Sequence, residues 1–153
     1  MIQLNSTFII VSTIIAVIAL IALLTVIVIL IRRRKPPLMD ELEGHDFEYY
    51  CADLLKESGF TNVKVTRGSG DFGADILANK DGISYAIQCK CYDKPIGVKA
   101  VQEIYAGRDY YDCMVGAVMT NQYFTDPAAE LARKLKIMLW DRDYVDNMEN
   151  KTK

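Results

Sequence analysis

The apolar run from Phe8 to Ile31 constrains the fold of this chain more than any other part of its sequence. It contains no charged residue and consists mainly of Ile, Val, Leu and Ala. As an α-helix it would be about 36 Å long, whereas the hydrocarbon core of a bilayer is about 30 Å thick. The run therefore predicts one helix that spans a membrane with some tilt.

The residues that follow this run set its expected orientation. Arg32-Arg33-Arg34-Lys35 comes directly after it, and Pro36-Pro37 cannot continue a helix. Because Lys and Arg accumulate on the cytoplasmic side of a span, we expect a single-pass protein of the cell membrane whose C-terminal part is cytoplasmic. The basic cluster acts as a topological stop, and in a second interpretation it also attracts the anionic lipid of the bilayer. Residues 1–7 carry no Lys or Arg, which disfavours a cleaved signal peptide.

The remaining sequence is long enough for one folded domain. We expect an anchor over residues 1–35 with its span at about 8–31, a linker over 36–41, a domain over 42–144 and a polar tail over 145–153. Four of the 18 Lys and Arg residues follow the span directly. The rest of the chain therefore has 14 basic residues and all 20 Asp and Glu residues, so it carries a net negative charge. Such an acidic domain needs a local basic patch to bind a polyanion. The four cysteines lack zinc-site spacing, and we expect free, reduced thiols that are mostly buried.

Hydrophobic periodicity and turn residues predict the elements of this domain. We expect a helix over 40–58, strands over 62–66, 74–78 and 83–92, a helix over 97–111, a strand over 114–119, a helix over 128–136 and a last strand over 137–140. Asp81-Gly82 is typical of a hairpin turn, so the first strands pair antiparallel. The strand, helix, strand order that follows favours parallel pairing. The fold class is therefore α/β, with a mixed sheet flanked by helices.

Candidate site residues gather between Gly68 and Lys90. Asp75 follows a glycine-rich turn at the start of a strand, and the period of two places Gln88 and Lys90 on one face of the next strand. A carboxylate and an amide oxygen, with the Cys89 carbonyl in addition, are the hard ligands that Mg²⁺ prefers. The lysine can orient or deprotonate a water, or stabilise charge that develops on a phosphate.

Glu48 flanks the apolar stripe of the first helix and offers a second carboxylate. Together these residue types point to metal-dependent hydrolysis of a phosphodiester. Each also has a plain structural interpretation: an aspartate in an Asx turn, a lysine that protects a sheet edge, a glutamate on a solvated helix. Asp71 lies between glycines and fits a turn residue better than a ligand.

The residues around these positions resemble the Mrr-type restriction endonuclease domain of the PD-(D/E)XK superfamily. The resemblance covers about Leu42 to Tyr144 and is carried by five segments, in order Phe47–Cys51, Gly68–Asp75, Gln88–Tyr92, Val98–Gln102 and Thr120–Ala129. It implies a restriction-endonuclease-like fold and Mg²⁺-dependent cleavage of DNA, with Mn²⁺ as a substitute.

The resemblance also implies roles for single residues. The catalytic residues would be Asp75, Gln88, Lys90 and Glu48, and three of these, Asp75, Gln88 and Glu48, would bind the metal. Gly73 and Gln102 would contact the substrate. The chain departs from the superfamily in having Gln88 where an acid is usual, and in having a membrane span where a separate DNA-recognition domain would stand.

The sequence thus predicts a membrane-anchored, Mg²⁺-dependent endonuclease that acts on DNA, in defence against foreign DNA or in DNA processing. The alternative is an inactive, membrane-anchored module of the same fold that binds DNA or protein. A nuclease for RNA or branched DNA fits the same residues. We expect the bilayer as a partner, and a homodimer where both strands of a duplex are cut.

Overall fold

The structure, a computed structural model, describes every residue except 1, 33–38, 67–69, 71 and 153. Arg33 to Lys35, the proline linker, Gly68, Ser69 and Asp71 lie outside the described residues. Helix α1 (Ile2–Arg32) forms a unit by itself. Its segment Phe8–Thr25, with a mean hydropathy of 2.9, is long and apolar enough to cross a membrane, a property that an N-terminal signal sequence would share.

The folded unit is built on a five-stranded mixed sheet in the order β1-β2-β3-β4-β5. The strands are β1 (Thr61–Val65), β2 (Ile76–Lys80), β3 (Ile83–Lys90), β4 (Val115–Thr120) and β5 (Met138–Trp140). The pairs β1–β2 and β2–β3 are antiparallel, whereas β3–β4 and β4–β5 are parallel. This mixed sheet confirms the predicted fold class.

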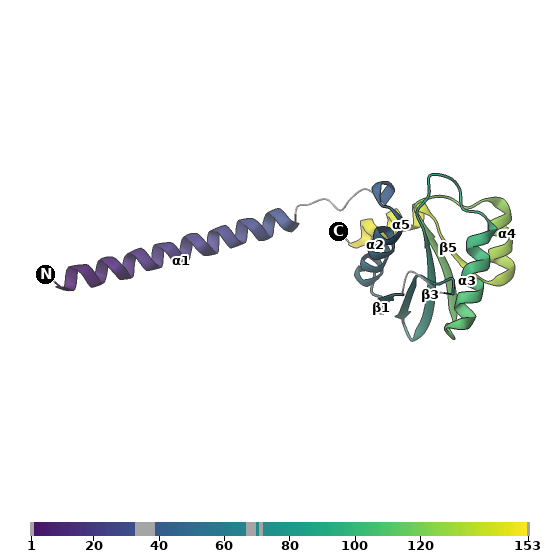
Figure 1. The fold of residues 1–153 in the computed structure, drawn as a ribbon, viewed down its shortest axis with the longest axis horizontal. Coiled ribbons are helices and arrows are strands. Elements are labelled where there is room, and N and C mark those ends of the chain that lie inside the picture. The colour runs from purple at the N-terminus through teal and green to yellow at the C-terminus, as the bar shows by residue number, and fades with distance from the viewer. Residues whose placement is uncertain (1, 33–38, 67–69, 71, 153) are drawn as a thin grey trace. The chain divides into compact units, whose positions relative to one another are not determined.

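Helices cover both faces of the sheet (Figure 1). Helices α2 (Gly44–Glu57) and α5 (Arg142–Thr152) pack on one face, and α3 (Val98–Tyr110) and α4 (Asp126–Leu135) pack on the other. A short 3₁₀ turn, η1 (Met39–Glu41), precedes α2. Two hydrophobic clusters result, one on each side of the sheet.

Local sequence explains two of the sharp chain reversals. Asp81 and Gly82 have φ values of +51° and +79° between the paired residues Lys80 and Ile83, which is the two-residue hairpin that matches strand twist. The hydroxyl of Thr125 accepts a hydrogen bond from the Ala128 amide at the start of α4. In the observed strand order β3 is the central strand.

Strand β3 has core on both sides. Ile87 and Cys89 belong to the cluster under α2, whereas Ala86 is fully buried in the cluster under α3. The helix that follows β3 returns over the face of Ala86 and closes it. Gln88 and Lys90 are therefore presented only near the end of the strand, where α3 begins.

The structure corrects three boundaries. The first helix begins at Gly44 rather than Asp40, and β2 begins at Ile76, so Asp75 lies just before its strand. The prediction of a polar tail over 145–153 was wrong, because α5 occupies Arg142–Thr152 and buries Val145 and Met148 in the core. Two apolar residues one turn apart are enough to dock this helix, but they are too few to give a clear periodic signal.

Candidate active site

A cavity of about 340 Å³ opens at the end of β3. It brings together five of the six predicted site residues, Glu48, Gly73, Asp75, Gln88 and Lys90. The rest of its lining consists of Gly44, Cys89, Cys91, Tyr92 and Glu103. Residues from α2, the loop before β2, the end of β3 and α3 thus converge on one space.

Asp75 is held from both neighbouring strands. Its amide donates to the Ile87 carbonyl on one side, and its carbonyl accepts from the Thr66 amide on the other, both at 2.8 Å. The Oδ2 atom of its carboxylate accepts the backbone N–H of Cys89 at 2.6 Å. Only 6% of the residue is exposed. Its backbone and carboxylate are therefore fixed before any ligand arrives.

The Gln88 amide donates through Nε2 to the same Oδ2 of Asp75. In the antiparallel register Ile76 pairs with Ile87, so Asp75 lies opposite Gln88 and the two side chains share a face. With its nitrogen engaged in this way, Gln88 offers an amide oxygen as its remaining polar atom. The neutral amide removes the repulsion that a second buried carboxylate would cause here.

Lys90 pairs with Glu103 of α3, and its Nζ lies 3.0 Å from Oε2 of that glutamate. Burial is the largest influence on the pKa of Lys90 and lowers it, but the contact with Glu103, the Glu103 charge and then the Asp75 charge together raise that pKa above its ordinary value. The amine is therefore protonated at neutral pH. An ammonium cannot take a proton from water, so the arrangement favours charge stabilisation over base chemistry.

Glu48 approaches the cavity from α2, with 19% of its side chain exposed. Its Oε2 lies 2.6 Å from Nδ1 of His45, one turn earlier on the same helix. Glu48 lines the cavity together with Asp75 and Gln88. The helix flank thus delivers a second carboxylate to the space beside Asp75.

Gln102 is the predicted site residue that does not line the cavity. It is exposed on α3, while the next residue, Glu103, lies in the cavity wall. Our interpretation of the sequence missed Glu103. A signal for it was present: Glu103 lies three residues after Ala100 and four before Gly107, both buried, so it shares the helix face that packs on the sheet.

Gly73 brings the loop before β2 into close contact with α3. It has φ of +92°, and a Cβ at this position would collide with the backbone carbonyl of Glu103. A Cβ on Gly107 would likewise lie 2.8 Å from the carbonyl carbon of Gly73. The two glycines therefore allow the loop that carries Asp75 to approach the helix that carries Glu103.

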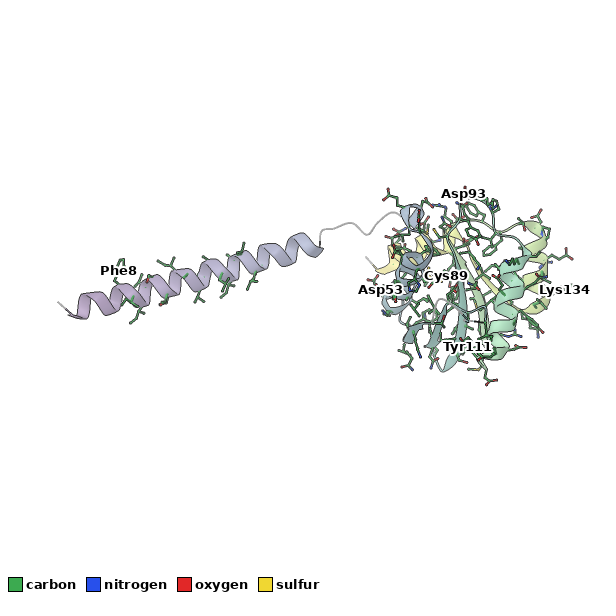
Figure 2. The ribbon with its side chains drawn as sticks, in the orientation of Figure 1. Phe8, Asp53, Cys89, Asp93, Tyr111 and Lys134 are labelled. Atoms are coloured by element: carbon green, nitrogen blue, oxygen red, sulfur yellow. The ribbon has the colours of Figure 1, made fainter. Side chains whose placement is uncertain are left out.

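The cysteines near the site are not reactive groups in this environment. All four are free, and burial is the main cause that raises the pKa of the Cys89 thiol well above its ordinary value, followed by its contact with Cys51. Figure 2 shows Cys89 within the body of the folded unit. A protonated, buried thiol is neither a nucleophile nor a ready metal ligand.

The residues present fit a hard divalent cation. Three carboxylates line the cavity, and Glu103 among them is paired with Lys90. The other two, Asp75 and Glu48, together with the Gln88 amide oxygen form the small oxygen set that Mg²⁺ takes when it keeps several waters. Over the described part of the chain no group of three or more His, Cys, Asp or Glu side chains is placed to hold a metal ion. The donor set is thus two acids and an amide, with Gln88 in the place of a third acid.

Two solved structures resemble the fold. One is a protein of unknown function, AF1548, with a TM-score of 0.55 and 23% identity over 67% of this chain and 65% of its own. The other is the DNA modification-dependent restriction endonuclease AspBHI, with a TM-score of 0.55 and 17% identity over 70% of this chain and 31% of its own. The chain thus spans less than two thirds of either protein, and at these identities the likeness shows the fold.

A search of curated protein sequences gave no match. The family model of the restriction endonuclease domain Mrr_cat, in contrast, matches residues 39–148, which include the whole sheet, the cavity and most of α5. This match covers well over half of the chain, so the chain belongs to the Mrr_cat family of restriction endonucleases.

Proposed function

We propose that this protein is a membrane-anchored, Mg²⁺-dependent endonuclease that hydrolyses phosphodiester bonds of DNA. One observation carries the proposal: Asp75, Gln88, Lys90 and Glu48, which come from two strand ends and a helix, line a single cavity. Family membership supports nuclease chemistry, and the structurally similar AspBHI is a restriction endonuclease that depends on DNA modification. Roles in defence against foreign DNA or in DNA processing belong to the same proposal.

Each side chain has a chemical task in this proposal. Asp75, Glu48 and the Gln88 oxygen bind the cation, which neutralises phosphate charge and lowers the pKa of a bound water. The Cys89 amide and the Gln88 amide keep the Asp75 carboxylate in place. The Lys90 ammonium stabilises negative charge on the phosphate as the bond breaks. The exposed Gln102 and the cavity residue Gly73 contact the substrate beside this centre.

The anchor and the domain plan complete the proposal. Helix α1 spans the membrane, Arg32 to Lys35 hold the C-terminal part on the cytoplasmic side, and the nuclease domain follows the linker over 36–41. The length and apolar character of α1 support the span, and the cytoplasmic orientation follows from the basic cluster alone. Substrate DNA would then be cut close to the inner membrane surface.

A cleavage assay tests the proposal. The detergent-solubilised full chain should nick supercoiled plasmid with Mg²⁺ and lose activity with chelator. Asp75→Ala and Lys90→Ala should each lower the rate by about 100-fold or more, because the first removes a ligand of the cation and the second removes the ammonium that stabilises charge on the phosphate. Lys134→Ala is the matched control, since Lys134 lies on the outer side of α4 (Figure 2).

Two outcomes would overturn the assignment. Nicking that survives in Asp75→Ala would place the chemistry elsewhere. DNA binding without any Mg²⁺-dependent cleavage by the unaltered chain would instead support the inactive binding module. If the chain cleaves RNA in preference to DNA, the assignment of the catalytic residues stands and the proposed substrate is wrong.

A further inference from the structure

Glu103 connects two lysines that approach it from different elements. Its Oε2 lies 3.0 Å from Nζ of Lys90 at the end of β3, and its Oε1 lies 3.7 Å from Nζ of Lys99, one turn earlier on α3. Both carboxylate oxygens therefore face an ammonium group. The three side chains together carry a net positive charge, whereas the folded unit as a whole is acidic.

The two lysines differ in their exposure. Only 20% of the Lys90 side chain is exposed, against 87% of the Lys99 side chain. The Oε2 atom of Glu103 is inaccessible to solvent. The inner end of this Lys90–Glu103–Lys99 group thus lies in the cavity wall, and its outer end reaches into solvent.

A second, smaller hollow of about 130 Å³ lies beside the cavity. Lys90, Glu103 and Tyr92 line both spaces, and Lys99 lines only the smaller one. A DNA strand whose scissile phosphate occupies the cavity must place its neighbouring phosphate a short distance away. The hollow beside Lys99 adjoins the cavity, because the two share three lining residues, and it therefore offers a place for one of these neighbours.

We propose that Glu103 is a positioning residue that aligns Lys90 and Lys99, and that the hollow beside Lys99 binds the backbone phosphate next to the scissile one. This inference rests on the proposed nuclease function and adds a substrate-phosphate site to it. Lys90 then acts on the reacting phosphate and Lys99 on its neighbour. Glu103 sets the distance between the two ammonium groups.

The contacts of Glu103 favour this role over a role as a metal ligand. A carboxylate with an ammonium at each oxygen has its charge compensated already. Asp75 and Glu48 line the same cavity and are the carboxylates proposed to bind the metal. A purely structural role of Glu103 would account for its pair with Lys90 but not for its pair with Lys99. The Lys99 pair is 3.7 Å long and the Lys99 side chain is largely exposed, so this pair contributes little to the stability of the fold.

DNA binding without divalent metal tests the phosphate site. The full chain in detergent and chelator is titrated with a short labelled duplex at several salt concentrations. Lys99→Ala should bind about eightfold more weakly at 0.1 M salt, and the slope of log K against log salt should fall by about 0.9, the value for one lost phosphate contact. Lys134→Ala, which removes the same charge from α4, should leave affinity and slope unchanged. Equal slopes for Lys99→Ala and the unaltered chain would refute the site.

Steady-state cleavage tests the positioning role. Glu103→Gln keeps the size of the side chain and both lysine charges, so DNA binding in chelator should not weaken, while kcat should fall about tenfold or more because Lys90 loses its fixed place. Lys99→Ala should raise KM and leave kcat nearly unchanged. The matched control is Glu130→Gln on the exposed side of α4. An unchanged kcat in Glu103→Gln, with the thermal midpoint retained, would refute the role.

The two assays separate this inference from the proposed function. If the unaltered chain cuts no DNA, the nuclease proposal fails, yet the salt slopes still report on Lys99. If the unaltered chain cuts DNA and neither variant differs from its control, only the inference about Glu103 and Lys99 fails.

Discussion

Asp75 is the residue on which the candidate site depends most. Its Oδ2 accepts two N–H groups, and the amide of Gln88 stands where a second carboxylate would face it across the strands. A buried carboxylate is tolerated when donors satisfy it, and a like charge beside it is costly. The amide at Gln88 therefore lets the site fold without metal.

Gln88→Glu tests this balance of charge. Without metal, two buried carboxylates would repel each other, so the thermal midpoint should drop by several degrees relative to the unaltered chain. Added Mg²⁺ should raise the thermal midpoint of the variant by more than it raises the midpoint of the unaltered chain, since a charged metal ligand replaces a neutral one. Differential scanning fluorimetry with and without Mg²⁺ measures both effects. Equal midpoints without metal would show that Gln88 does not relieve repulsion.

Buried and half-buried thiol and phenol groups predict how the stability of the folded state depends on pH. The pKa values of Cys89 and Cys91 lie above the ordinary 9.0, and that of Tyr50 lies above 10.0, with burial as the largest cause in each case. In the unfolded chain these groups lose their protons at the ordinary values, whereas in the folded chain they keep them. The unfolded state then binds fewer protons, so stability is complete below about pH 8 and falls as pH rises further.

Urea unfolding of the full chain in detergent at pH 7, 8, 9 and 10 measures this effect. The midpoint should be constant up to about pH 8 and then decrease. Cys89→Ala should show a shallower decrease between pH 8 and 10, because one of the titrating groups is gone. A midpoint that rises with pH above 9 would contradict the burial of these groups.

At the scale of elements, the site depends on how closely α3 approaches the loop before β2. The approach is possible because Gly73 in the loop and Gly107 in the helix have no side chain at the point of contact. Through it, the loop residue Asp75 and the helix residue Glu103 reach the same cavity. The family resemblance assigned Gly73 to substrate contact, and its packing against α3 gives it a structural task as well.

Gly73→Ala should displace α3 from the loop. We expect a loss of stability above the about 1–2 kcal/mol that a left-handed conformation alone costs an alanine, and a large loss of cleavage. Gly82→Ala is the matched control, because Gly82 also has positive φ, at +79°, but open space where a Cβ would stand. Thermal unfolding compares the two variants, and equal losses would contradict the close contact.

Most elements could be predicted from the sequence because their signals are local. The hairpin at Asp81-Gly82, the cap at Thr125 and the alternation along β3 each occupy a few neighbouring residues. Helix α5 was missed because it depends on Val145 and Met148 meeting a core that only the folded sheet provides. The helix face of Glu103 could be predicted from Ala100 and Gly107, but its partner Lys90 becomes visible only when α3 has folded over β3.

At the scale of the whole molecule, a long apolar helix and a nuclease-family domain share one chain. In the proposed function, one centre at the cavity lined by Asp75 would cut one strand at a time. Two-strand cleavage would then need two copies, and confinement to a membrane would raise their effective concentration. The homodimer on the bilayer is a prediction that follows from this proposal.

Reconstitution into vesicles tests this prediction. At one or fewer chains per vesicle, plasmid should be nicked but not linearised, and linear product should appear as the number of chains per vesicle rises. The same total protein with α1 deleted should yield mostly nicked circles, provided that the shortened chain remains folded. Linear product at one chain per vesicle would contradict the need for two copies.

The most direct test of the central claim combines cleavage with metal binding in one titration. The full chain and its variants receive increasing Mg²⁺, while plasmid nicking and the thermal midpoint are followed together. The unaltered chain should begin to nick DNA over the same Mg²⁺ range in which its midpoint rises. Asp75→Ala should show neither change, and Lys90→Ala should show the rise in midpoint without nicking. Nicking by either variant at the rate of the unaltered chain would contradict the account.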